Sequence, residues 1–177
     1  MRRISAVWFA FLLFAATSST LSAQQSIYML VDPIKGVEPA PHSGEFKLNS
    51  FSSASANSMG IGSVTSRATT GKATFPPIKV SMRFQPVSSA SFYGSVAAGT
   101  RLPSIEIRLY NTSNRMFYKT VFENVFLTNV ATEASDEALQ QIEFVYSRAK
   151  WFASPDAAGL DAPVQVGCWD LTLAKSC

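Results

Sequence analysis

The stretch that decides the fold reads SIEIRLYNTSNRMFYKTVFENVFLT and covers residues 104–128. Its first part, Ser104–Tyr110, alternates apolar and polar side chains with a period of two, which is typical of a strand with one buried face. The NTSN segment, Asn111–Asn114, favours a tight turn, and a second apolar run follows from Met116 to Thr128. The stretch therefore predicts an antiparallel hairpin. The residues expected to face its core are Ile105, Ile107 and Leu109.

The second arm of this hairpin is apolar on both faces. Val121, Val125 and Leu127 are expected on one face, whereas Phe122 and Phe126 are expected on the opposite one. A large apolar patch left open on a monomer marks a contact surface. We therefore interpret Phe122 and Phe126 as candidate subunit-interface residues.

Further segments with strand character bring the total to seven or eight strands. They are Ser26–Asp32, Glu45–Phe51, Ala73–Phe84, Leu139–Trp151 and Val164–Leu173. One short helix is expected over residues 88–99 (SSASFYGSVAAG), with Ser88 or Ser89 as its N-cap and Gly99 just past its end. Many strands with one short helix predict a mainly β fold, a small antiparallel β-barrel or two-sheet sandwich.

The segment Ser50–Gly71 differs in composition from the strands around it. Of its 22 residues, 16 are Ser, Thr, Gly or Ala, and Arg67 carries its only charge. Such a segment buries too little apolar surface to order itself alone. It is either a solvated surface loop or a loop that becomes ordered against a neighbouring subunit. For the second case the assembly-loop candidates are Met59, Ile61, Val64 and Arg67.

Residues 1–23 have the order of a secretory signal peptide. Arg2 and Arg3 precede an apolar run of eleven residues, which is followed by the small-residue stretch TSSTLSA before Gln24. Eleven apolar residues are well short of the roughly 20 needed to span a bilayer. We expect a signal peptide over residues 1–23 and one domain over residues 24–177, exported to the periplasm or the extracellular medium and not held in a membrane after cleavage.

The charge of the predicted mature chain is almost balanced. The full chain of 177 residues has 15 Lys and Arg against 12 Asp and Glu. Without Arg2 and Arg3 the balance becomes 13 against 12, and no basic cluster remains. The composition therefore does not favour nucleic acid or an anionic membrane surface as a partner.

The chain offers few residues for catalysis or for cofactor and metal binding. Its one histidine, His42, stands between Pro41 and Ser43 in a turn-rich segment and is expected to be a solvated turn residue. Glu133, Asp136 and Glu137 lie in a polar connection. The strand carboxylates Glu106, Glu123 and Glu143 meet only if the fold brings them together. No nucleophile or phosphate-binding motif is present, so we expect no enzyme, no cofactor and no metal site.

Two cysteines, Cys168 and Cys177, lie close to the C-terminus. Export to an oxidising compartment permits a disulfide between them. An extended strand between them would hold the sulfur atoms far apart unless the terminal residues fold back. An intermolecular bridge and a buried free Cys168 are the alternatives.

The order of these segments resembles the haemolysin-coregulated protein (Hcp) family, which forms the tube of bacterial type VI secretion. The resemblance runs from about Ile27 to Leu173. It rests on IYMLVDPIKGVE, HSGEFKLNSFSSASANS, GKATFPPIKVSMRF, the helix leading into SIEIRLYN, YKTVFENVFLTNV and the closing GCWDLTLAKS. It implies a compact β-barrel with one helix on its side, six copies in a ring, rings stacked into a hollow tube, and contact of the Ser50–Gly71 loop with a neighbouring ring.

Two features depart from the family pattern, namely the export signal and the extension to Cys177. We therefore expect an exported Hcp-like structural protein whose main partner is itself, in hexameric rings or stacked tubes. Secretion-apparatus components and small effector cargo are further expected partners. The alternative is a monomeric exported binding module that holds a glycan or peptide with the Ser50–Gly71 loop.

Overall fold

The computed structural model describes residues 25–57, 73–134, 137–156 and 162–177. The predicted signal peptide and the assembly-loop candidates Met59, Ile61, Val64 and Arg67 lie outside the described residues. The elements are β1 (Ser26–Asp32), β2 (Phe46–Ser52), β3 (Ala56–Asn57), β4 (Ala73–Thr74), β5 (Ile78–Arg83), α1 (Pro86–Ala98), β6 (Arg101–Tyr110), β7 (Met116–Glu133), β8 (Leu139–Val145), β9 (Arg148–Ala153), β10 (Val164–Asp170) and β11 (Lys175–Ser176).

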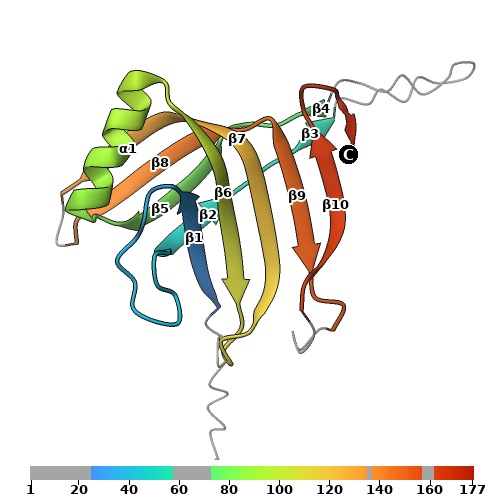
Figure 1. The fold of residues 1–177 in the computed structure, drawn as a ribbon, viewed down its shortest axis with the longest axis horizontal. Coiled ribbons are helices and arrows are strands. Elements are labelled where there is room, and N and C mark those ends of the chain that lie inside the picture. The colour runs from blue at the N-terminus through green and yellow to red at the C-terminus, as the bar shows by residue number, and fades with distance from the viewer. Residues whose placement is uncertain (1–24, 58–72, 135–136, 157–161) are drawn as a thin grey trace, which may run out of the picture.

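Six of these strands close into a barrel. The main sheet has nine strands in the order β11-β10-β9-β7-β6-β1-β2-β5-β8, and an additional pairing of β7 with β8 joins its far end back to its middle. All pairings are antiparallel. Strands β9, β10 and β11 lie outside the closed barrel and extend the sheet on the side opposite α1 (Figure 1). We call them the C-terminal extension. The predicted mainly β fold with one helix is confirmed.

The hairpin of residues 104–128 forms as its sequence predicts. Ile105 and Ile107 are buried, and β6 pairs with β7 along its length. Asn111 closes the turn, because its side-chain oxygen accepts hydrogen bonds from the backbone N–H groups of Ser113 and Arg115, both at 3.0 Å. Asn114 adopts the left-handed region with φ 55°, which asparagine tolerates better than most residues.

The core fills the barrel with apolar side chains from all six barrel strands and from α1. Phe122 and Phe144 meet edge to face with ring centroids 5.3 Å apart, and Phe46 contacts Phe92 of the helix at 5.4 Å. The largest fully buried side chains are Phe46, Phe92, Phe122, Phe144, Met29, Ile78, Met82, Leu102, Ile105, Ile107, Ile142 and Gln140.

Helix α1 begins two residues earlier than its expected N-cap. Gln85 is the N-cap residue without a side-chain cap bond, and Pro86 starts the helix, where its missing N–H costs nothing. Ser88 and Ser89 are buried in the first turns. The Ser88 hydroxyl donates to the Lys35 carbonyl at 2.8 Å, and the Ser89 hydroxyl donates to Gln140 Oε1 at 2.9 Å. The predicted serine cap was therefore wrong, whereas Gly99 does end the helix at φ 60°.

The segment Leu139–Trp151 forms two strands instead of one. β8 ends at Val145 and β9 starts at Arg148, with Tyr146 and Ser147 between them. The chain bends there and continues along the same neighbour, because β8 pairs with the C-terminal half of β7 and β9 pairs with its N-terminal half. The Ser147 N–H donates to the Glu123 carbonyl at 3.1 Å and fixes this corner.

The C-terminus folds back on β10. This is the condition under which Cys168 and Cys177 can form a disulfide. Residues 171–174 turn, with Ala174 at φ 50°, and β11 pairs with Trp169 and Asp170. This brings the Cα atoms of Cys168 and Cys177 to 5.3 Å, and a disulfide joins them. The structure thus contains the intramolecular pair rather than a free Cys168.

Two glycines give a matched test of this packing. A Cβ on Gly36 would lie 1.8 Å from the Glu45 carbonyl oxygen, whereas a Cβ on Gly94 would have no atom within 4 Å. We expect Gly36→Ala to lower the free energy of unfolding by at least about 2 kcal/mol, because the backbone must move apart. Gly94→Ala, in the middle of α1, should raise it by about 0.5–1 kcal/mol.

Urea denaturation of the two variants measures both changes. Equal effects of the two substitutions would contradict the close backbone approach at Gly36.

Candidate assembly surfaces

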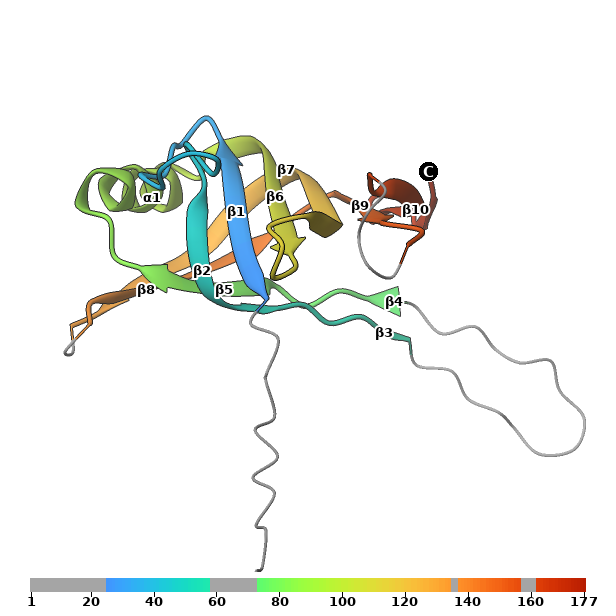
Figure 2. The same cartoon turned by 90° about the horizontal axis from the view of Figure 1, so that it is seen from below.

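A narrow ribbon of two short strands projects from the barrel (Figure 2). Strand β2 runs on into β3, which pairs with β4 as Ala56↔Thr74 and Asn57↔Ala73. In Figure 2 this ribbon projects beyond the barrel, below β9 and β10. The described part of Ser50–Gly71 is thus in part strand. We call residues 53–57 and 73–75 the stem.

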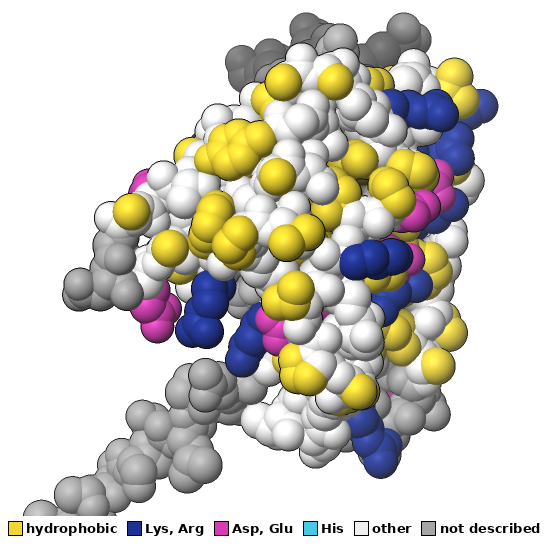
Figure 3. Space-filling view, turned by 60° about the vertical axis from the view of Figure 1, so that its left-hand side comes forward, with side chains coloured by type: hydrophobic (Ala, Val, Ile, Leu, Met, Phe, Trp, Pro, Cys, Tyr) yellow, Lys and Arg dark blue, Asp and Glu magenta, His cyan; other side chains and the backbone are white. Residues whose placement is uncertain are grey.

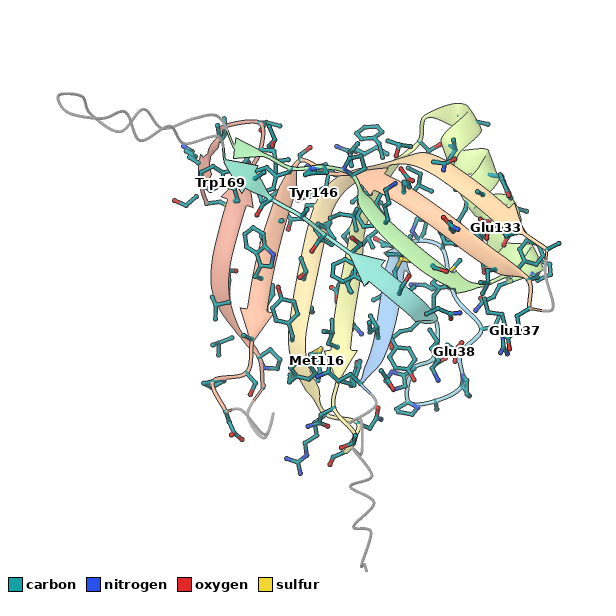
Figure 4. All side chains as sticks on the ribbon, turned by 180° about the vertical axis from the view of Figure 1, so that it is seen from behind. Glu38, Met116, Glu133, Glu137, Tyr146 and Trp169 are labelled. Atoms are coloured by element: carbon teal, nitrogen blue, oxygen red, sulfur yellow. A yellow bond between two sulfur atoms is a disulfide. The ribbon has the colours of Figure 1, made fainter. Side chains whose placement is uncertain are left out.

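The stem lies against the inner side of the C-terminal extension. Phe75, just after β4, has its ring centroid 6.4 Å from that of Trp169 on β10. A small cavity of about 120 Å³ lies between the stem residues Ser53–Ser55 and the aromatic side chains Tyr146 and Trp151. Burial raises the pKa of the Tyr146 hydroxyl. Figure 4 shows Tyr146 and Trp169 on this side of the sheet.

The two candidate interface phenylalanines have different environments. Phe122 is 2% exposed and packs against Phe144 and Tyr146, so it is a core residue and the prediction that it lies at a subunit interface was wrong. The physical reason is Asn124, whose φ of 52° interrupts the alternation of β7 and brings Phe122 and Val125 to the same side. Phe126 is 41% exposed and stays a predicted interface residue.

Phe126 does not stand alone on the outer surface. Its cross-strand partner on β8 is Val145, which is 36% exposed. A directly opposed aromatic and β-branched pair forms a compact apolar contact. We call Phe126 and Val145 the Phe126 patch.

A second apolar surface lies around the N-terminus of α1. Val37 and Val87 are 69% and 83% exposed, the highest values among the large apolar residues described. Both line a groove of about 610 Å³ beside Lys47 and Arg83, and Val87 also lines a second groove of about 650 Å³ beside Lys35 and Arg101. Figure 3 shows this side of the molecule, where hydrophobic groups alternate with charged ones and the surface is hollowed.

The sole histidine is buried, so the expectation of a solvated turn residue was wrong. The His42 ring stacks on Tyr28 with centroids 3.7 Å apart. Its Nδ1 lies 2.7 Å from Glu45 Oε2, and its Nε2 lies 2.9 Å from Asn114 Oδ1. His42 thereby fastens the β1–β2 connection to the β6–β7 turn. No local sequence pattern predicts this contact, because His42 and Asn114 are 72 positions apart in the sequence.

The strand carboxylates do not meet in one site. Glu106 pairs with Arg108, Glu143 pairs with Lys79, and Glu123 pairs with Arg148 and Lys150. Glu133 and Glu137 lie at the opposite end of the sheet from Trp169 (Figure 4). Among the described residues no three His, Cys, Asp or Glu are grouped so that they could hold a metal ion.

Among the described residues of the C-terminal extension, Asp170 is a carboxylate that accepts several hydrogen bonds. Its Oδ1 accepts hydrogen bonds from the Thr172 hydroxyl at 2.6 Å, the Thr172 N–H at 2.9 Å and the Leu173 N–H at 3.0 Å. Its Oδ2 accepts from Arg148 Nη2 at 3.0 Å. These bonds, that of the Thr172 hydroxyl above all, hold the pKa of Asp170 well below its ordinary value. The carboxylate therefore shapes the turn that folds the C-terminus back.

The different environments of the two phenylalanines predict different costs of truncation. We expect Phe122→Ala to lower the free energy of unfolding by about 3–5 kcal/mol, because it leaves a cavity in the core. Phe126→Ala should lower it by less than about 1 kcal/mol. Chemical denaturation under conditions that keep the chain monomeric measures both, and comparable losses would contradict the burial difference.

The lowered pKa of Asp170 predicts a loss of stability in acid. Because the folded-state pKa lies below the unfolded value of about 3.9, the stabilisation is present above that value and is lost as pH falls. Asp170→Asn should therefore be less stable than the wild type at pH 7, and the difference should shrink only as pH falls below about 4. Urea unfolding at pH 7, 4, 3 and 2 measures it. A difference that does not change with pH would count against the role of the charge.

No helix in the described part of the chain has the length and apolar character needed to cross a membrane.

No curated protein matches the chain. The likeness to solved structures, in contrast, covers almost all of their length. The first is described as the structure of a type six secretion system protein and is 21% identical, with TM-score 0.77, over 87% of this chain and all of that one.

Two further solved structures have the same fold. Hcp1 from Salmonella typhimurium is 14% identical with TM-score 0.71, over 86% of this chain and 99% of that one. A variant of the Hcp1 protein from E. coli EAEC 042 is 20% identical with TM-score 0.65, over 83% and 98%. Residues 28–152 match the family model described as "Type VI secretion system effector, Hcp". That match spans well over half of the sequence, so the chain belongs to the Hcp family of type VI secretion.

Proposed function

We propose that this chain is an exported structural member of the Hcp family that assembles with copies of itself into hexameric rings, which stack into tubes. The observation that carries the proposal is the family match over residues 28–152, which runs through six barrel strands and α1. The family is one of structural secretion proteins. In this proposal the protein acts by self-association, through contacts between the surfaces of its protomers, and not by catalysing a reaction.

The exposed apolar side chains support self-association. The Phe126 patch and the Val37 and Val87 pair lie on the surface of a single copy. Covering such side chains is worth roughly 25 cal/mol per Å² of apolar surface removed from water. A ring is built from head-to-tail contacts between two different surfaces of the protomer, and the chain offers the Phe126 patch and the Val37 and Val87 pair for this purpose.

The projecting ribbon supports stacking. Strands β3 and β4 bond to each other and carry the loop with the assembly candidates Met59, Ile61, Val64 and Arg67. A ribbon that extends beyond the barrel can reach a neighbouring ring without moving the barrel itself. We propose that this loop contacts that ring.

Two features support export to the periplasm or the medium. Residues 1–23 have the order of a signal peptide, and Cys168 and Cys177 form a disulfide. Disulfides persist in oxidising compartments and are rare in the bacterial cytoplasm. A chain folded after export would close this disulfide where it is stable.

The test is the mass of the mature chain, from Gln24 to Cys177. Analytical ultracentrifugation should give a species of six protomers, and negative-stain microscopy should show rings. Phe126→Asp should raise the concentration needed for half-assembly by at least about tenfold, because a desolvated carboxylate would be placed in the contact.

Leu173→Asp is the matched control, since Leu173 is 60% exposed and lies in the C-terminal turn. It should leave the mass unchanged. A chain that stays monomeric at high concentration would contradict the proposal and would favour a monomeric binding module for a glycan or peptide.

A further inference from the structure

Strand β10 forms the open edge of the main sheet. The barrel strands close on themselves through β7 and β8, so within the described strands this sheet ends at β10 and at the short β11 beside it. The stretch Val164–Cys168 pairs with β9 on one side, whereas β11 pairs only with Trp169 and Asp170. An uncovered strand edge is a template for pairing with another chain, and proteins block such edges with charges, bulges or covering segments.

This edge lacks the charges that usually block one. The stretch VQVGC, Val164–Cys168, has no ionisable side chain apart from the disulfide-bonded cysteine. A register shift between Gln165 and Gly167 forms a bulge at Val166, and β11 covers the other end. The blocking of the edge therefore depends on one bulge and on β11.

Little besides the disulfide holds β11 in place. The residues from Thr172 to Cys177 are all exposed, so β11 buries almost no apolar surface. Its two paired residues are fewer than a strand normally has. Asp170 fixes the turn as far as Leu173, and the bond from Cys168 to Cys177 fixes the residue after β11. Breaking the disulfide would leave β11 free to detach.

We propose that the Cys168–Cys177 disulfide closes a strand-pairing surface on β10, and that its reduction lets a second copy of this chain pair with this edge through its own β10. An antiparallel pairing of identical strands places like residues near one another, so edge charges would repel. The neutral stretch Val164–Cys168 avoids that cost. Val164 and Val166, which are 54% and 61% exposed, would lose part of their contact with water.

The contact is two-fold symmetric and uses the same edge on both copies. It therefore differs from the head-to-tail contacts of the proposed ring and goes beyond them. In the oxidised chain β11 occupies the edge at Trp169 and Asp170. In the reduced chain this cover is removed, so all seven residues of β10 lie along an uncovered edge in which only the bulge at Val166 remains.

The opening step is an ordinary thiol–disulfide exchange. A dithiol reductant attacks one sulfur as its thiolate, the bond between Cys168 and Cys177 breaks, and the second reductant thiol closes the disulfide of the reductant. Two electrons and two protons pass to the cysteines, which become thiols. An oxidising compartment lacks such dithiols, so the exported chain keeps this edge closed there until a dithiol reaches it.

The experiment compares the oxidised mature chain with the double variant Cys168→Ser/Cys177→Ser. Sedimentation velocity over a range of concentrations should show a step to twice the mass of the oxidised particle for the double variant only. Hydrogen exchange of the amides of residues 164–168 should be slower in the larger species. Adding Val166→Lys should remove the step, because pairing of two copies would bring like charges near one another at the edge.

Ala90→Lys in the same double variant is the matched control, since Ala90 is exposed on α1, on the side of the molecule opposite β10 (Figure 1); it should leave the step in place. Equal masses of the oxidised chain and the double variant at every concentration would overturn the inference. A larger species that survives Val166→Lys would overturn it as well.

If the double variant does not fold, two other samples test the same inference. One is the folded wild type treated with a dithiol. The other is a chain that ends at Leu173 and carries Cys168→Ser, which removes β11 and keeps the Asp170 turn. The mass of the oxidised wild type alone tests the proposed ring, so failure of the ring and failure of the redox-controlled edge are seen separately.

Discussion

Strand β7 is hydrogen-bonded to three other strands. Its backbone conformation changes within the strand, at the point where one partner ends and the next begins. Its first half, as far as Glu123, pairs with β9, and its second half, from Phe126, pairs with β8, while β6 runs along its other side. Asn124 stands between these halves with a left-handed φ of 52°. This single backbone angle lets one strand both close the barrel and support the C-terminal extension.

The extension depends on β7 through charge as well as through backbone bonds. Glu123 of β7 binds Arg148 of β9, and Arg148 binds Asp170 of β10. Asp170 in turn orders the turn that returns the chain to β11 and to the disulfide. A series of polar contacts that starts in the middle of the barrel wall therefore holds the chain as far as the turn at Leu173, and the disulfide holds the residue after β11.

Local patterns predicted the strands well because each pattern is a statement about neighbouring residues. The bounds of β1 agree with the predicted Ser26–Asp32, and the Asn111–Asn114 turn forms as expected. The same patterns failed for Phe122, because the alternation rule assumes an unbroken strand and cannot register a left-handed residue. They failed for His42, because its partners Tyr28 and Asn114 lie far from it in the sequence.

By itself the sequence determined the mainly β class, the positions of most strands, the single helix and the shortage of catalytic groups. These follow from side-chain periodicity, turn residues and composition, which are properties of short segments. Only the tertiary structure decided that the sheet closes between β7 and β8, that Phe126 and not Phe122 faces outward, and that Cys168 meets Cys177. Those outcomes depend on which strands become neighbours. Strand pairing joins residues that are far apart in the sequence, and it depends on the packing of the complete core.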